Sequence, residues 1–257
     1  MEIRLNKYLS EAGVCSRREA DRLIESGQVT VDGKRAEMGM KISDSQVVRV
    51  GKKEIQPKNE MVLLAVNKPV GIVCTEEKKE KNNIIRFLDY PIRITYIGRL
   101  DKDSEGLLLM TNNGDIINKM MRAGNYHEKE YKVTVNKPIT PEFIEKMANG
   151  IPILDTVTRK CEVEMIGKYK FRIVLTQGLN RQIRRMCEYL GYKVTRLERI
   201  RVMNIELGNL KPGEMRKVTE EEIARLYELI KDSSNETVRI EDGTEKATHA
   251  RVGRTIK

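Results

Sequence analysis

The chain contains no tryptophan, three phenylalanines, two histidines and four cysteines. So few large aromatic rings exclude extensive base stacking along a nucleic-acid strand, although nine tyrosines leave room for one or two stacked bases. The cysteines are far apart and few histidines accompany them, which indicates neither a disulfide framework nor a zinc site. We therefore expect reduced thiols and a cytoplasmic protein.

Long hydrophobic runs are also missing. None approaches the roughly 18 apolar residues that a membrane span requires, and Met1 to Lys7 lack the apolar core of a signal peptide. We expect no membrane association. The apolar fraction of 39% over 257 residues is adequate for a packed core, and the length allows one full-sized domain with a small one.

Positive charge is abundant. The formal net charge is +10 at pH 7, and clustered Lys and Arg gain affinity for a polyanion by displacing counterions from phosphates. Solubility alone would be the simpler explanation. The excess of basic residues in every part of the chain favours a nucleic-acid partner.

Residues 1–58 have the pattern of a small unit with two short helices followed by a small sheet. Apolar residues recur at helical spacing until Gly13, and Ser16 to Glu19 form a capping-box sequence that opens a second helix. Short β-type runs then follow around an Asp-Gly turn. The basic residues of the helices avoid the apolar stripe, and we expect them on one outward face, where they either bind RNA or are merely solvated: Arg4, Lys7, Arg17, Arg18 and Arg22.

Residues 61–231 have the pattern of an α+β domain with a mixed, mainly antiparallel sheet flanked by helices, because strands outnumber helices and several adjoin through tight turns. Strands are predicted at 61–66, 94–97, 107–110, 130–135, 161–165, 171–175, near 194 and at 202–207. Helices are predicted from Asp115 to Gly124, after Thr140, from Arg181 to Gly191 and from Thr219 to Lys231. Residues 232–257 contain few apolar side chains and predict a flexible basic tail.

The polar stretch from Gly98 to Leu107 lies between two of these strands, a good mount for a catalytic group. A calcium loop is disfavoured, because a bidentate Glu is missing at its twelfth position. A pair of acids acting on a glycosidic bond is disfavoured, because Asp101 and Asp103 are two residues apart and would point opposite ways in an extended loop. One working carboxylate, or a purely structural turn, remains.

Two stretches resemble known families. RLNKYLSEAGVCSRREADRLIESGQVTVDGK, residues 4–34, is similar to the small RNA-binding domain first seen in the fourth small-subunit ribosomal protein. GRLDKDSEGLLLMTNNGD, residues 98–115, resembles the signature of the Rsu/Rlu-type pseudouridine synthases. Three further motifs occur in the same order as in that family: NKPVG at 67–71, KEYKV at 129–133 and QGLNRQIRRMCEYLGY at 177–192. The stretches around the signature are most similar to the F-type branch of the family, which modifies large-subunit ribosomal RNA.

The resemblance implies an RNA pseudouridine synthase that needs no cofactor and acts on structured RNA, with 23S ribosomal RNA favoured over small-subunit RNA or tRNA. It implies Asp101 as the catalytic carboxylate, with Tyr131 and Arg184 as companions. We expect Arg184 to pair with Asp101, Tyr131 to offer a flat surface to uracil, and Asp103 to be structural. A phosphate contact for Arg184 and a core position for Tyr131 are the alternatives.

Arg99, beside Asp101, is a candidate to fill the helical gap left by an extruded uridine. The rival function is a non-catalytic RNA-binding or ribosome-assembly factor, and we expect a monomer in either case. The residues for which we expect RNA contacts are Arg4, Lys7, Arg17, Arg18, Arg22, Arg99, Asn180, Arg181, Gln182 and Arg185.

Overall fold

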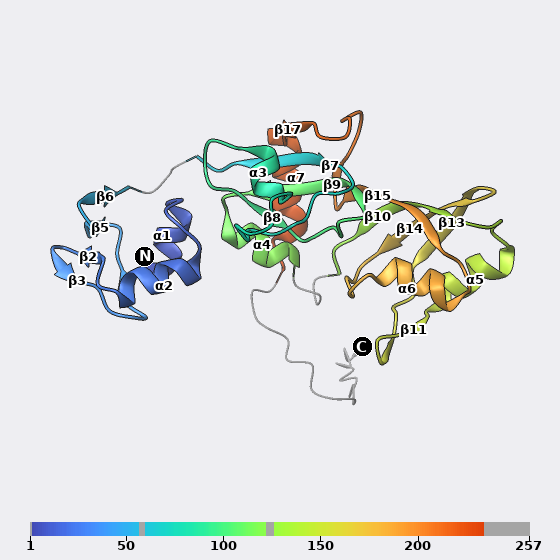
Figure 1. Ribbon diagram of the computed structural model, residues 1–257, viewed down its shortest axis with the longest axis horizontal. Helices are drawn as coiled ribbons and strands as arrows, with labels where there is room; N and C mark the ends of the chain where they lie inside the picture. The colour runs from blue at the N-terminus through green and yellow to red at the C-terminus, as the bar shows by residue number, and fades with distance from the viewer. Residues whose placement is uncertain (1, 57–59, 122–125, 234–257) are drawn as a thin grey trace, which may run out of the picture.

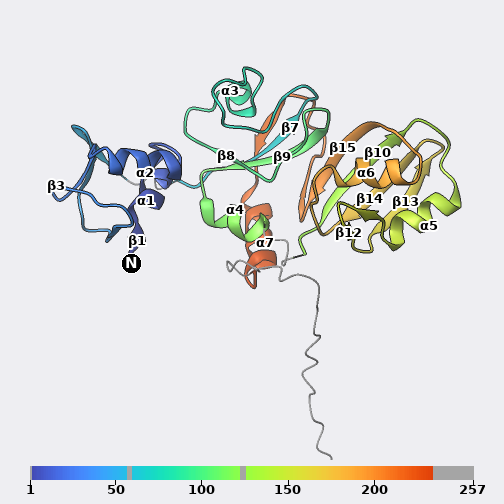
Figure 2. The same cartoon turned by 60° about the horizontal axis from the view of Figure 1, so that its bottom comes forward.

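The computed structural model describes residues 2–56, 60–121 and 126–233. The predicted helix end at Gly124 lies outside these residues, as does the predicted tail apart from Asp232 and Ser233. Three parts lie along the long axis of the molecule: the N-terminal helices and small strands, then the region around β7 (Leu63–Lys68) and β9 (Glu105–Thr111), to which the C-terminal α7 (Glu220–Ile230) returns, then the region around β10 (Lys129–Val135), β14 (Lys170–Leu175), α5 (Pro141–Asn149) and α6 (Gln182–Tyr189) (Figures 1 and 2). Among the described residues, no helix is long and apolar enough to cross a bilayer.

The first part is the predicted pair of short helices with a small sheet. Its elements are β1 (Ile3–Arg4), α1 (Leu5–Glu11), α2 (Arg17–Glu25), β2 (Val29–Val31), β3 (Lys34–Arg35), β4 (Lys41–Ile42), β5 (Val48–Val50) and β6 (Lys53–Ile55). Leu9 of α1, Ile24 of α2 and Val29 of β2 are almost fully buried in one shared core. This part therefore has a hydrophobic core of its own.

The start of α2 only half matches its predicted capping box. The Ser16 hydroxyl accepts a hydrogen bond from the Glu19 backbone N–H at 3.2 Å, as a cap should. The Glu19 carboxylate does not reach back to the cap. It pairs with Arg22 at 3.1 Å, one turn further along the helix.

A nine-stranded mixed sheet makes up most of the rest. Its main path runs, in spatial order, through β13 (Glu162–Gly167), β14 (Lys170–Leu175), β10 (Lys129–Val135), β15 (Val194–Val202), β9 (Glu105–Thr111), β7 (Leu63–Lys68) and β17 (Met215–Lys217). Off this path, β8 (Thr95–Ile97) pairs with β9, and β16 (Ile205–Glu206) pairs with β15. A separate hairpin joins β11 (Pro152–Ile153) to β12 (Thr156–Val157).

Strand β15 was predicted as separate short strands, but it is continuous. Charged side chains interrupt the apolar pattern there, and the structure pairs several of them across strands: Arg196 with Glu105, and Arg201 with Glu130 at 2.6 Å. β15 pairs with β10 antiparallel and with β9 in parallel, where Arg199 lies opposite Gly106. This parallel pairing joins the two halves of an otherwise antiparallel sheet within the described residues.

Helices cover both faces of the β7–β9 half of the sheet and one face of the β10–β14 half. The helices are α3 (Ile84–Leu88), α4 (Gly114–Met121), α5 (Pro141–Asn149), α6 (Gln182–Tyr189) and α7 (Glu220–Ile230). α4 and α7 share a core with one face of β7 and β9, α3 packs on their other face, and α5 and α6 pack on β10 and β14. The Phe87 side chain is 40% exposed, because Ile84 and Leu88 form the inward side of the short helix α3.

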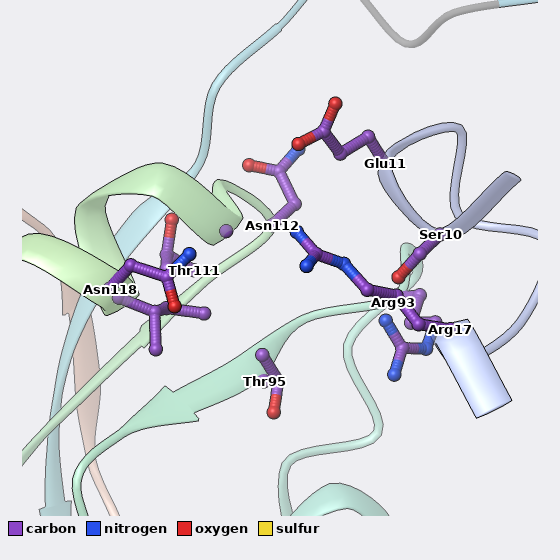
Figure 3. A pocket seen from close by; sticks show the side chains of 10 residues that line it. Ser10, Glu11, Arg17, Arg93, Thr95, Thr111, Asn112 and Asn118 are labelled. Atoms are coloured by element: carbon purple, nitrogen blue, oxygen red, sulfur yellow. The ribbon is translucent and has the colours of Figure 1, made fainter. Parts of the chain in front are cut away.

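The first part contacts the sheet through basic residues that were predicted to face outward. Lys7 Nζ lies 3.0 Å from Asp115 Oδ1 at the start of α4, so Lys7 faces the rest of the protein. Arg17 lines a cavity of about 290 Å³ together with Arg93 and residues of β9 and α4. Figure 3 shows this cavity, with side chains from both parts of the chain around it. Part of the predicted basic face is thus an internal contact.

Gly106 is where the fold tolerates no side chain. Its φ is +100°, and a Cβ there would lie 2.3 Å from the Arg199 carbonyl oxygen. We predict that Gly106→Ala lowers the free energy of unfolding by at least about 3 kcal/mol, through backbone strain together with a clash that cannot relax. Urea unfolding would measure it.

Gly39→Ala is the matched control, because Gly39 has φ +79° and open space around the added Cβ. Its cost should be about 1–2 kcal/mol, from strain alone. Equal losses in the two variants would contradict a close approach of β9 and β15.

Candidate active site

The loop of residues 98–104 joins β8 to β9 and opens on a cavity of about 540 Å³. The Ser104 backbone N–H donates to the Asp101 carbonyl at 3.1 Å, which closes a turn, and the Ser104 side chain is buried. The Gly71 N–H donates to the Lys102 carbonyl at 2.7 Å and ties the loop to the turn after β7. The loop is therefore held at both its centre and its end.

Asp101 lies in this turn and lines the cavity, with its side chain 36% exposed. Arg181 Nη1 is 3.4 Å from Asp101 Oδ2 and 3.2 Å from Asp103 Oδ1. The two carboxylates thus face one cation, and the prediction that they point opposite ways is wrong, because the chain turns between them. Asp103 does not line the cavity, so the two acids remain inequivalent.

Arg184 pairs with Asp103 and not, as predicted, with Asp101. It is buried, and its Nη2 donates to the Asp103 carbonyl at 2.8 Å and to Ser104 Oγ at 3.3 Å. It also lies 3.3 Å from Asp103 Oδ2. The pKa of Asp103 lies below its ordinary value: burial raises it, but the hydrogen bond from Arg181 and the charge of Arg184 outweigh burial. Arg184 therefore holds the loop in place through its contacts with Asp103 and Ser104.

Arg181 reaches Asp101 because of an unusual backbone conformation. It precedes α6 with φ +50° and ψ +35°, the left-handed region that few residues other than glycine adopt. Such strain persists where the surroundings hold it, and here the side chain is fixed by hydrogen bonds to Asp103. Sequence reasoning had placed Arg181 only among the RNA contacts.

Lys68 supports the loop from the turn after β7 and was missed as a site residue. It is completely buried, and its Nζ donates to the carbonyls of Pro69 and Ile72, each at 2.9 Å. Burial lowers the pKa of Lys68, which the nearby acids, Asp101 among them, partly restore. The signal was present in the NKPVG run, where a lysine ends a buried strand.

The opposite wall of the cavity comes from β10 and β15. Tyr131 of β10 lines it, as do Lys129 on the same strand and Arg199 on β15. Tyr131 and Arg199 are direct partners across the two strands. The structure brings Tyr131 into the same cavity as Asp101, whereas sequence reasoning gave no role to Lys129 or Arg199. The alternation of residues along a strand does not by itself show that a positively charged side chain lines a cavity.

The residues near the cavity that were predicted to contact RNA differ in their exposure and in the hydrogen bonds that they already make within the protein. Arg99 is exposed and lines the cavity. Asn180 also lines it but accepts hydrogen bonds from Arg185. Gln182 is 5% exposed, and its Oε1 accepts the Leu179 N–H at 3.1 Å, so its amide serves the local fold.

The predicted RNA contacts of the first part also differ. Arg4 and Arg18 are exposed, Arg22 is exposed but paired with Glu19, and Lys7 and Arg17 lie at the contact with the sheet. Across the described ranges, no group of three or more His, Cys, Asp or Glu side chains is arranged to hold a metal ion.

Lys129 should make stability depend on pH. Burial, and secondly the charge of Arg199, lower its pKa to about 8 from the usual 10.5. Holding the charged form costs the folded state free energy below pH 8, and the cost fades between pH 8 and 10.5. The stability of Lys129→Met relative to wild type should therefore be greater at pH 7 than at pH 10, as measured by urea unfolding at both values.

Lys132→Met on the same strand is the control, because Lys132 is exposed. Its difference from wild type should not change between the two pH values. The same flat result for Lys129→Met would show that its ammonium is not destabilised in the folded protein.

Comparison with known proteins identifies the relatives of this chain. A family model described as RNA pseudouridylate synthase matches residues 62–189, and an S4 domain model matches residues 3–48. A solved crystal structure of a pseudouridylate synthase is 28% identical, with a TM-score of 0.65, and the match covers 87% of this chain and 99% of that one.

Curated relatives match over nearly the whole chain. The dual-specificity RNA pseudouridine synthase RluF of Salmonella typhi is 57% identical over 91% of this chain and 81% of its own length. The ribosomal large subunit pseudouridine synthase B of Bacillus subtilis is 32% identical over 90% of this chain and 98% of its own. Matches of this extent, over a sheet and cavity built as described, establish that the chain belongs to the RNA pseudouridylate synthase family.

Proposed function

We propose that Asp101 is the catalytic carboxylate with which this RNA pseudouridine synthase isomerises a uridine held in the 540 Å³ cavity. One observation carries the proposal: among the described residues that line the cavity, Asp101 is the single carboxylate. The guanidinium of Arg181 lies beside it, with Nη1 3.4 Å from Asp101 Oδ2. A charged carboxylate at the edge of a concave, partly apolar site is suited to covalent or acid–base work.

The isomerisation breaks the bond between the base and the ribose, rotates the uracil and forms a carbon–carbon bond. It involves no redox change and no net addition of atoms. One ionised carboxylate can attack the anomeric carbon, attack carbon six of the ring, or remove the ribose 2′ proton. The geometry of Asp101 is compatible with each of these roles.

The neighbours of Asp101 then have separate tasks. Tyr131 offers its ring to the uracil and its hydroxyl to proton relay. Arg184 acts as a positioning residue, because its contacts are to Asp103 and Ser104 and it fixes the turn that carries Asp101. Arg99, exposed at the cavity, occupies the gap that the extruded uridine leaves in the RNA.

The RNA is recruited, in this proposal, by residues 1–58, and catalysis belongs to residues 61–231, followed by a basic tail at 232–257. We place the substrate in 23S ribosomal RNA, since the Bacillus subtilis relative is named for the large ribosomal subunit. The name of the Salmonella typhi relative, which includes dual specificity, keeps a second RNA such as tRNA open. The enzyme would act as a cytoplasmic monomer.

Asp101→Asn tests the catalytic assignment and separates it from a purely RNA-binding role. The change removes the charge and keeps the shape, so pseudouridine formation should fall by at least about 1,000-fold while RNA affinity stays nearly unchanged. Single-turnover assays on transcribed ribosomal RNA, with filter binding alongside, would measure both.

Asp89→Asn is the matched control. Asp89 is exposed at the end of α3 with φ +42°, a conformation that asparagine also accepts. It should leave the rate unchanged. Turnover by Asp101→Asn at the rate of this control would remove Asp101 from the catalytic role.

Two exposed basic residues test RNA recruitment by the first part. Arg4→Gln with Arg18→Gln should weaken RNA binding and reduce the slope of log affinity against log salt by about 1 to 2, because each phosphate contact contributes about 0.7 to 0.9. Arg225→Gln is the control, since Arg225 is exposed on α7 and paired with Glu228. Identical slopes for all variants would contradict RNA contacts by Arg4 on β1 and Arg18 on α2.

A further inference from the structure

Two cations from neighbouring strands, Lys129 on β10 and Arg199 on β15, line the cavity. Arg199 is 2% exposed and Lys129 is partly buried, and both line the cavity that also holds Asp101. Within the part of the chain that the structure describes, neither forms an ion pair with a carboxylate. The charge of Arg199 also lowers the pKa of Lys129, which reflects their proximity.

The backbone fixes Arg199 at the centre of the sheet. Its neighbours across the strands are Tyr131 on β10 and Gly106 on β9, and its Nε donates to the Leu107 carbonyl at 2.7 Å. This hydrogen bond holds the guanidinium in place. The side chain therefore cannot swing away to find another partner.

One nitrogen of Arg199 is left over. Nη2 is buried and has no hydrogen-bond partner among the described residues. A buried donor without a partner costs the folded protein free energy, more when the group is charged. Lys129 is little better served, since its Nζ has one long hydrogen bond of 3.3 Å, to the His127 carbonyl. Like charges left together in this way are typical of a site prepared for a negatively charged or oxygen-rich ligand.

We propose that Arg199 and Lys129 receive the carbonyl oxygens of the target uracil and stabilise the negative charge that develops on them during isomerisation. This inference rests on the proposed function of the cavity. Tyr131 lies beside Arg199 on the neighbouring strand, so a ring placed against Tyr131 brings its oxygens within reach of both cations.

The chemistry requires such a pair of donors whichever role Asp101 takes. When the C1′–N1 bond breaks, its electron pair stays on the uracil and is shared with O2 and O4; attack on carbon six places charge on O4 in the same way. C1′ then bonds to C5, the C5 proton leaves, and N1 gains a proton, so atoms and charge balance. Fixed cations in a water-poor site are effective at holding transient charge of this kind.

A phosphate of the RNA backbone fits these two residues less well. Phosphates remain at the surface when a base is flipped inward, and Arg99, exposed at the same cavity, is available to them. The wall with Arg199 is reached by the base itself.

The test uses the full-length enzyme and an RNA with its target position mapped. Arg199→Lys keeps the charge but not the planar fork, and the single-turnover rate at saturating enzyme should fall by about 100-fold or more, with RNA affinity within about twofold of wild type. Lys129→Met supplies a second variant in which the other cation is removed. Thermal unfolding of each variant checks that it is folded.

Sulfur replacement in the substrate distinguishes a direct contact of Arg199 and Lys129 with the uracil oxygens from a purely structural role of these residues. The same RNA is prepared with 2-thiouridine or 4-thiouridine at the target, because sulfur accepts hydrogen bonds poorly. At least one replacement should slow wild type and have little further effect on Arg199→Lys or Lys129→Met, a non-additivity that a structural role does not produce. Arg201→Lys is the control, since Arg201 on β15 is held by Glu128 and Glu130; it should respond to sulfur as wild type does.

Equal sulfur effects in wild type and in both variants would overturn the inference while leaving the proposed function in place. Failure of wild type to convert the unmodified RNA would overturn the proposed function, and this inference with it.

Discussion

The close approach of β9 and β15 at Gly106 is the constraint on which the rest of the candidate active site depends. The two strands run parallel there, with no room for even a Cβ at residue 106. That pairing joins the half of the sheet that carries the Asp101 loop to the half that carries Tyr131. The cavity is lined by residues of both halves, so the backbone contact at Gly106 also sets the geometry of the candidate site.

Several positively charged side chains surround the one carboxylate, Asp101, among the described residues that line the cavity. Arg181 contacts Asp101, Arg184 holds the loop, and Lys129 and Arg199 face the cavity without a carboxylate partner among the described residues. A cavity lined by several cations attracts an anionic polymer. It also costs the free protein stability, which a bound RNA would offset.

Most helices and strands, and the position of the polar loop between β8 and β9, follow from the sequence, because apolar runs, caps and turns are local signals. Sequence reasoning did not predict which arginine meets Asp101, since about 80 residues separate them and the left-handed conformation of Arg181 decides the outcome. It also missed the inward direction of Lys7, which depends on packing between two parts of the chain. The role of Arg199 was not predicted. Whether a charged residue on a strand is buried depends on the register of that strand with its neighbours, and a single sequence does not reveal this register.

The central claim is that this cavity isomerises a uridine in RNA with one carboxylate, and mapping pseudouridines tests it most directly. Ribosomal RNA and tRNA would be compared between cells with the gene, cells without it, and cells complemented with wild type or with Asp101→Asn. The account predicts that one or a few pseudouridines disappear with the gene and return with wild type alone. An identical set of pseudouridines in all four strains would contradict it.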